Sequence, residues 1–132
     1  MSLVVAAIVS AAADAVEAAG VTPVYERRMG ALDGREGAVV RIGPQGVVTQ
    51  YINGQADVEQ PVRVLCKRRG VTEAMADAEK VWDALDGLRV TAGATEVTVT
   101  ATRTPMELSM DDSGYSIWEV DATALYRTEG QT

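Results

Sequence analysis

The sequence has no histidine, one cysteine and only two lysines. With no histidine and a single thiol, the chain cannot form an internal disulfide or a His/Cys zinc site. A nucleophilic Ser, Thr or Cys would need a lysine or a carboxylate as its base. The carboxylates, however, are spread over predicted helix faces and turns. We therefore expect no catalytic residue, no metal and no cofactor, and we do not expect an enzyme.

Aromatic residues and positive charge are also scarce. Two Trp, four Tyr and no Phe leave the core to Val, Leu, Ile, Met and Ala, in a chain of 132 residues that is 47% hydrophobic. This length fits a single domain, residues 1–132, with a core of its own. Twelve Lys and Arg against 19 Asp and Glu give a net charge of −7. Phosphate contacts need concentrated positive charge, so a protein that coats nucleic acid is disfavoured, whereas one that DNA slides past is not.

The N-terminal segment predicts a helix from Leu3 to Ala19, capped by Ser2 and ended by Gly20. It lacks the positive start of a signal peptide, and it is too short to span a membrane, so we expect no membrane partner. Its surface is rich in alanine and other small apolar residues, more than one buried face requires. Either the helix lies under a sheet, or a second subunit covers part of it.

The middle of the chain alternates short apolar runs with turn residues, a pattern typical of antiparallel strands. The glycine-rich segment Gly30–Gly37 matches no phosphate-binding loop in its spacing, and we expect the mobile tip of a hairpin there. Gly43–Gly46 has the composition of a β-turn, and Asn53–Gly54 marks another turn. These elements predict an antiparallel meander. Its expected strands are 21–29, 38–42, 47–52 and 58–69.

The last of these strands ends in the only dense basic run, Lys67-Arg68-Arg69. Such a run usually faces water at a strand end, but it can also dock an acidic edge of a neighbouring subunit. Both interpretations stay open. Cys66 lies just before the run, on the apolar side of the alternation, and this position indicates a buried structural thiol.

A second helix is predicted from Glu73 to Asp86, with Thr72 as its N-cap and Gly87 after its end. Its apolar stripe has Trp82 in the middle, so we expect this side chain to anchor the core. The stripe comprises Met75, Ala78, Trp82 and Leu85 with Val81 beside it, and Asp77, Glu79, Lys80 and Asp83 are expected to point outward.

The last third of the chain, Glu96–Arg127, predicts a long hairpin closed by an Asp-Asp-Ser-Gly turn, which does not match a calcium loop. On its second run Trp118 and Val120 alternate with Glu119 and Asp121, so one face is apolar and the other is charged. The apolar face needs a covering layer. Together the elements predict an α+β fold: a mainly antiparallel, twisted sheet with two helices packed on it and a long C-terminal β-hairpin.

An opening helix, the helix VTEAMADAEKVWDALDG between strands, and the ending TPMELSMDDSGYSIWEVDATALYR follow one another in this chain. In the ending, Pro105 precedes a polar turn and a final strand. This order of elements resembles the small tail-completion proteins of long-tailed bacteriophages, the tail terminator or phage minor capsid protein family. The resemblance covers nearly the whole chain as a pattern of elements.

The resemblance implies a structural virion protein without an active site. It implies a homo-oligomeric ring, usually a hexamer, that caps the finished tail tube and offers a surface to the head connector or stopper. DNA would cross the lumen without specific binding. The protein would lie in the tail or neck of the virion and would be assembled in the cytoplasm of the bacterial host.

Charged residues are the candidates for contacts between subunits. We expect two arginines near residue 27 and the basic run to pair with the Asp-Asp turn of a neighbour, while the charged face of the last strand meets a neighbour or the lumen. Two other functions stay open: a head-completion stopper, and a small-ligand-binding or regulatory α+β dimer unrelated to phage. The expected interface set is Arg27, Arg28, Lys67, Arg68, Arg69, Asp111, Asp112, Glu119 and Asp121.

Overall fold

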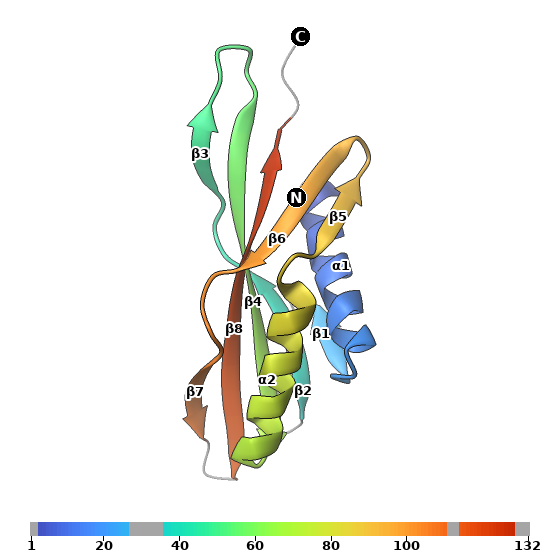
Figure 1. Cartoon of the computed structure of the whole chain (residues 1–132), viewed down its shortest axis with the longest axis vertical. Helices are drawn as coiled ribbons and strands as arrows, with labels where there is room; N and C mark the ends of the chain where they lie inside the picture. Colours follow the sequence, from blue (N-terminus) through green and yellow to red (C-terminus); the bar gives the residue numbers. More distant parts are fainter. Residues whose placement is uncertain (1–2, 27–35, 111–113, 129–132) are drawn as a thin grey trace.

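The computed structural model describes residues 3–26, 36–110 and 114–128, which form two helices and eight strands. The strands make one curled, mostly antiparallel sheet with the helices packed on it (Figure 1). The predicted α+β fold and its C-terminal hairpin are confirmed. In chain order the elements are α1 (Leu3–Ala18), β1 (Val24–Glu26), β2 (Gly37–Ile42), β3 (Gly46–Gln50), β4 (Ala56–Arg69), α2 (Val71–Leu85), β5 (Arg89–Ala92), β6 (Thr95–Ala101), β7 (Met106–Met110) and β8 (Tyr115–Arg127).

The sheet is organised around two long antiparallel strands, β4 and β8. They pair from Asp57 opposite Arg127 to Arg69 opposite Tyr115. Side chains alternate between two faces along this ladder. The face toward the helices holds the core, and the alternation predicted for the last strand is confirmed. No helix of the described chain packs on the opposite face, which carries the odd-numbered residues of β4 and β8 and is called the open face below.

Each long strand carries two shorter strands on its outer edge, one after the other. β2 pairs with residues 62–67 of β4, and β3 pairs with residues 56–59. Likewise β6 pairs with residues 122–125 of β8, and β7 pairs with residues 116–119. The order is therefore β3-β4-β8-β6-β5 in one half of the molecule and β1-β2-β4-β8-β7 in the other (Figure 1). The predicted meander is wrong here, because β2 and β3 share β4 and do not pair with each other.

The passage from β2 to β3 is held by two residues in the middle of β4. The carbonyl oxygen of Pro61 accepts a hydrogen bond from the Gly43 amide at 3.0 Å, so this edge of β4 faces the connection. Proline has no amide hydrogen to donate. At this position, between the segments of β4 that pair with β2 and with β3, no described strand residue lies opposite Pro61 on this edge, so no ladder hydrogen bond is missing. The buried Gln60 side chain donates from Nε2 to the carbonyl oxygens of Gly43 (2.6 Å) and Pro61 (3.1 Å). Gly43–Gly46 is thus a crossing between strands on one edge, and not the predicted hairpin turn.

The first strand begins later than expected and runs parallel to its neighbour. Of the predicted residues 21–29, β1 takes up Val24–Glu26, while 27–29 lie outside the described residues; Val24 lies opposite Ala38 of β2. It is an edge strand, as the preceding Pro23 suggests. Most of the predicted loop Gly30–Gly37 lies outside the described residues.

The second helix begins at Val71, and Gly70, not the predicted Thr72, is its N-cap. Gly70 has φ 108°, a backbone conformation that favours glycine, and no side chain caps the helix. The buried face is also turned from the predicted stripe: Met75 is 38% exposed, and Asp77 is buried. The buried residues of α2 are Ala74, Asp77, Ala78, Val81 and Leu85.

The N-terminal helix packs beside α2 on the same face of the sheet (Figure 1). It contacts β1, β2, β5 and α2, and Ile8 and Val16 have no exposed surface there. The helix ends near Gly20, which adopts φ 93° as a residue after a C-cap does. Its exposed positions include Ser10 and Asp14. Of the two alternatives for its apolar surface, packing on the sheet accounts for the large side chains.

Candidate functional site

The basic run at the end of β4 is held against the protein. Lys67 is only 7% exposed, and its ammonium lies 4.7 Å from the centre of the Tyr115 ring. Arg69 packs on the same ring and donates to the Tyr115 hydroxyl at 3.0 Å. Arg68 donates from Nε to a carboxylate oxygen of Asp77 on α2. The prediction that the run simply faces water at a strand end is therefore wrong for Lys67 and Arg68. Arg69 is the exposed residue of the run.

Asp77, the ion-pair partner of Arg68, was predicted from the helical spacing to point outward, and this prediction is wrong. Its side chain is buried against Arg68, which also donates from Nη2 to the carbonyl oxygen of Thr22 at 2.7 Å. Beside this pair Cys66 is buried, as predicted. Burial, together with the charge of Asp77, raises the pKa of the Cys66 thiol to about 12. The thiol therefore stays protonated at neutral pH, in keeping with a structural role.

Four of the expected interface residues lie outside the described residues. These are Arg27, Arg28, Asp111 and Asp112. Their pairing with a neighbouring subunit stays a prediction.

Glu119 and Asp121 lie on the open face of β8, where two arginines hold them. Arg63, directly opposite Asp121 in the ladder, has its Nε 3.7 Å from that carboxylate and 3.8 Å from Glu119. Arg103, between β6 and β7, contacts both carboxylates through Nη2, at 3.4 Å for Glu119. The carboxylate side chains are 11% and 13% exposed, whereas those of Arg63 and Arg103 are 58% and 53% exposed. A neighbour reaching this place would therefore meet the arginines first.

The two carboxyl groups of this cluster also affect each other. The hydrogen bond with Asp121, the loss of solvent and the charge of Asp121 raise the pKa of Glu119, although Arg63 and Arg103 act in the opposite direction. Oδ1 of Asp121 is buried and has no hydrogen-bond partner among the described residues. Within the same residues no three His, Cys, Asp or Glu side chains gather as a metal site. The cluster is a charge network on a sheet face.

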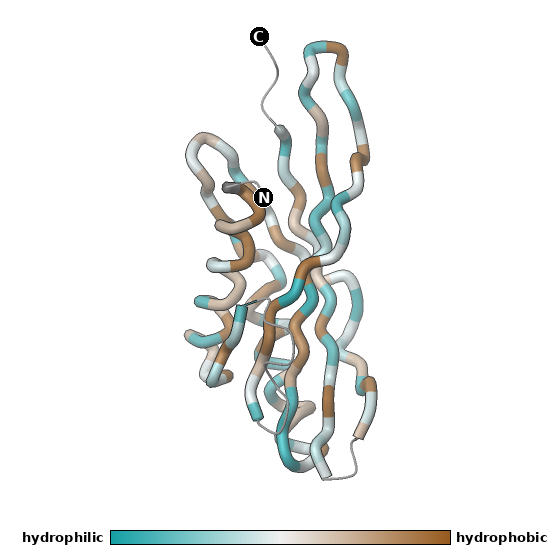
Figure 2. Tube along the Cα trace, turned by 180° about the vertical axis from the view of Figure 1, so that it is seen from behind, coloured by the Kyte–Doolittle hydropathy of each residue, from teal (hydrophilic) through white to brown (hydrophobic). Residues whose placement is uncertain are grey.

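The hairpin of β3 and β4 projects at one end of the molecule and is ordered by its own polar contacts (Figure 1). The Tyr51 hydroxyl donates to Asp57 at 2.8 Å, and Arg127 donates to the other oxygen of Asp57 at 2.8 Å. These bonds, that of Arg127 first, lower the pKa of Asp57. The side chain of Ile52, in the turn, is fully exposed. Figure 2 shows hydrophobic residues on this hairpin, including its tip.

Two edge strands expose apolar side chains along their length. Every residue of β3 and of β7 is exposed. Within the described chain each of these strands pairs with a single neighbour, so one edge of each is open. Open edges and clustered apolar side chains are typical of surfaces that another protein covers. The large apolar residues concerned are Val47 and Val48 on β3, and Met106, Leu108 and Met110 on β7.

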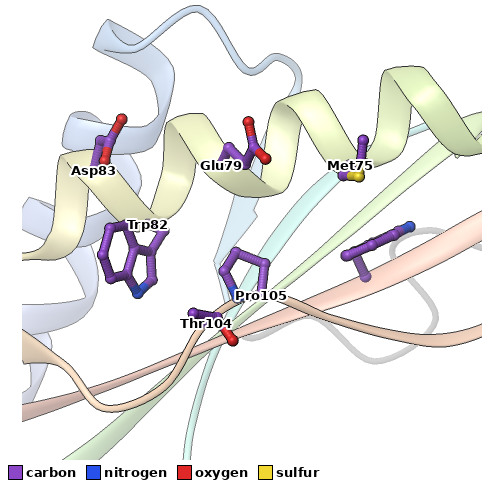
Figure 3. A pocket seen from close by; sticks show the side chains of 7 residues that line it. Met75, Glu79, Trp82, Asp83, Thr104 and Pro105 are labelled. Carbon is purple, nitrogen blue, oxygen red and sulfur yellow. The ribbon is translucent and has the colours of Figure 1, made fainter.

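A groove of about 450 Å³ opens between α2 and the connection from β6 to β7 (Figure 3). Trp82 is half-buried in it, packs against the core and donates from Nε1 to the carbonyl oxygen of Arg103 at 3.1 Å. Its predicted role as a core anchor is thus right for one part of the ring, while another part lines the groove. The lining residues are Met75, Glu79, Trp82, Asp83, Thr104, Pro105 and Trp118.

These features define a small α+β subunit whose exposed edges and charged faces suit assembly with other proteins. None of its described helices has the length and apolar character that crossing a membrane requires. The family model of the bacteriophage tail terminator protein matches residues 15–128. The chain therefore belongs to the bacteriophage tail terminator protein family, and it is a structural protein of the phage virion. The resemblance inferred from the order of elements is confirmed, and the dimer unrelated to phage is set aside.

A solved structure shares the fold. It is described as the virion of a native gene transfer agent (GTA) particle, and one of its chains has a TM-score of 0.63 and 20% sequence identity. The alignment covers 94% of this chain and 97% of the other. At this identity the likeness concerns the fold alone. No curated protein matches the sequence.

Proposed function

We propose that this chain, acting as one domain over residues 1–132, is a tail terminator. It forms a closed ring of identical subunits, a hexamer, on the end of the finished tail tube and joins the tube to the head connector or stopper. It does so without a catalytic residue, a metal or a cofactor. Membership of the terminator family over residues 15–128 supports this proposal most directly.

The open, apolar edge strands carry the structural part of the argument. A closed ring needs two different surfaces on each subunit, because every contact is head-to-tail. A cap also needs contacts with the tube on one side and the connector on the other. β3 and β7 lie in opposite halves of the sheet, and both are exposed throughout. They therefore offer separate apolar surfaces for separate neighbours.

The charge of the chain suits a lumen that DNA crosses. A net charge of −7 gives weak repulsion of phosphates. Two of the exposed arginines of the open face, Arg63 and Arg103, are already bound to Glu119 and Asp121. DNA would then pass without specific binding. Assembly would take place in the cytoplasm of the bacterial host.

The decisive experiment is deletion of the gene in the phage, followed by electron microscopy of the particles. We expect tail tubes of irregular length that are not joined to heads, and expression of the protein in trans should restore both features. Tubes of normal, uniform length that fail to join heads would instead indicate a stopper. Normal particles would contradict both functions.

A further inference from the structure

The central row of the open face contains two arginines directly opposite each other. Arg41 of β2 pairs in register with Arg63 of β4. Like charges at directly opposed positions destabilise a sheet. Arg63 has two carboxylates nearby, Glu119 and Asp121, but Arg41 is exposed and makes no ion pair or hydrogen bond with any described residue. Among the described residues, the row therefore carries a positive charge that no carboxylate balances.

The opposite side of the molecule carries the complementary excess. Met75, Glu79 and Asp83 are spaced four residues apart and form one exposed stripe along α2. Neither Glu79 nor Asp83 makes an ion pair within the described chain, and Lys80 is the one basic residue of the helix. Figure 3 shows both carboxylates on the α2 side of the groove that contains Trp82. This stripe is acidic, partly apolar and unpaired with any residue that the structure describes.

We propose that α2 of one subunit packs on the open face of the next, with Glu79 and Asp83 meeting Arg41 and Arg63. This inference rests on the proposed ring and states which surfaces close it. The two surfaces lie on opposite sides of one subunit, so they cannot satisfy each other within a single chain. A head-to-tail contact uses each surface once per subunit, and this is the arrangement that closes by rotation.

The same contact would bury the apolar residues of the open face and those at the rim of the Trp82 groove. A sheet with helices on only one face is completed when a helix packs on its other face. Leu65 and Ile117 are half-buried on the open face and would pack against the rim of the Trp82 groove. A nucleic acid is the poorer occupant of this face, because its phosphates offer no apolar surface to Leu65 and Ile117, whereas the α2 stripe offers Met75.

Charge exchange tests the contact. Arg41→Glu and Glu79→Arg should each raise the protein concentration needed for half-assembly by about tenfold or more, as measured by light scattering. The double variant, which restores opposite charges, should recover most of that loss. Arg89→Glu and Glu17→Arg change exposed charges outside the contact and serve as matched controls. Arg41→Glu should not lower the melting temperature of the free subunit, because it removes a like-charge pair.

Cross-linking gives a second, independent measurement. Cys66 is buried, so cysteines introduced at other positions react without competition from it. Arg41→Cys combined with Glu79→Cys should give disulfide-linked oligomers under oxidising conditions, whereas Arg41→Cys combined with Glu17→Cys should not. The measurement is made on the purified chain and on particles carrying the variants.

The outcomes separate this inference from the function beneath it. Rings visible by electron microscopy, with neither charge rescue nor cross-linking, would place the interface elsewhere and leave the terminator function standing. Loss of binding to a DNA fragment in Arg41→Glu, with ring assembly unchanged, would make nucleic acid the occupant of this face and overturn the proposal. Particles that carry the protein but no ring would contradict the ring and the inference together.

Discussion

Arg68 of β4 and Asp77 of α2 form an ion pair across the contact between sheet and helix. Their side chains are 20% and 12% exposed, so the pair is largely withdrawn from solvent. Arg68 also reaches the carbonyl oxygen of Thr22, in the segment that leads from α1 into β1. A single arginine thus joins the end of the longest strand, the second helix and the first strand connection.

Loss of this carboxylate should destabilise the fold. Asp77→Ala leaves the Arg68 guanidinium without its partner in a poorly solvated place, and we expect the free energy of unfolding to fall by about 1–3 kcal/mol. Urea denaturation measures the change. Asp83→Ala removes an exposed carboxylate from the same helix and should stay within about 0.5 kcal/mol of the parent. Equal stabilities for the two variants would contradict the structural role of the pair.

The same pair decides how the basic run can be tested. Replacing Lys67, Arg68 and Arg69 together would disturb folding as well as any contact between subunits. Arg69→Glu alone leaves the pair with Asp77 in place, and it is the cleaner substitution for the docking interpretation of the run.

Glu119 should make stability depend on pH. Its pKa is raised in the folded state, so the folded chain binds its proton more tightly than the unfolded chain does. The contribution of this proton is complete below the ordinary glutamate pKa and is lost as pH rises through the folded-state pKa. Glu119→Gln should therefore flatten the decline of melting temperature with rising pH. Glu96→Gln, at an exposed position of β6, is the control, and identical profiles for both variants would contradict the prediction.

Trp82 should contribute less than a fully buried tryptophan. Truncation of a fully buried Trp costs about 3–5 kcal/mol, and because Trp82 is half-buried we expect about 2–3 kcal/mol for Trp82→Ala. Trp82→Phe also loses the hydrogen bond to Arg103 but keeps part of the packing. Its free energy of unfolding should therefore fall less than that of Trp82→Ala. Chemical denaturation of the two variants gives both values. A negligible loss for Trp82→Ala would mean that the ring does not pack on the core.

Ile52 should matter for assembly and not for folding. Its side chain is fully exposed on a hairpin that is already ordered by Tyr51, Asp57 and Arg127. Ile52→Asp should leave the free energy of unfolding within about 0.5 kcal/mol of the parent, yet reduce the yield of completed tails. Asn53→Asp adds the same charge at the neighbouring position and isolates the apolar contribution. Normal tail completion in Ile52→Asp would remove the tip from the assembly surface.

The sequence by itself determined the elements and the faces of the long strands. A period of two along β8 separates Val120 from Glu119 and Asp121, because successive side chains of a strand point to opposite faces. Strand alternation also placed Cys66 correctly on the buried face, and the helix-end signal of glycine placed Gly20 correctly after the first helix. The order of elements was also sufficient for the family resemblance, since it survives where individual residues differ.

Only the tertiary structure decided which elements meet. Local alternation shows that Arg63 faces outward, but its position opposite both Asp121 and Arg41 depends on pairing between strands far apart in the sequence. The burial of Asp77 depends in the same way on Arg68 arriving from another element to neutralise it, and helical spacing carries no information about such a partner. On the shared edge of β4, where β2 and β3 follow each other, Pro61 lies at the junction and offers no amide hydrogen. A turn composition alone cannot distinguish that crossing from a hairpin.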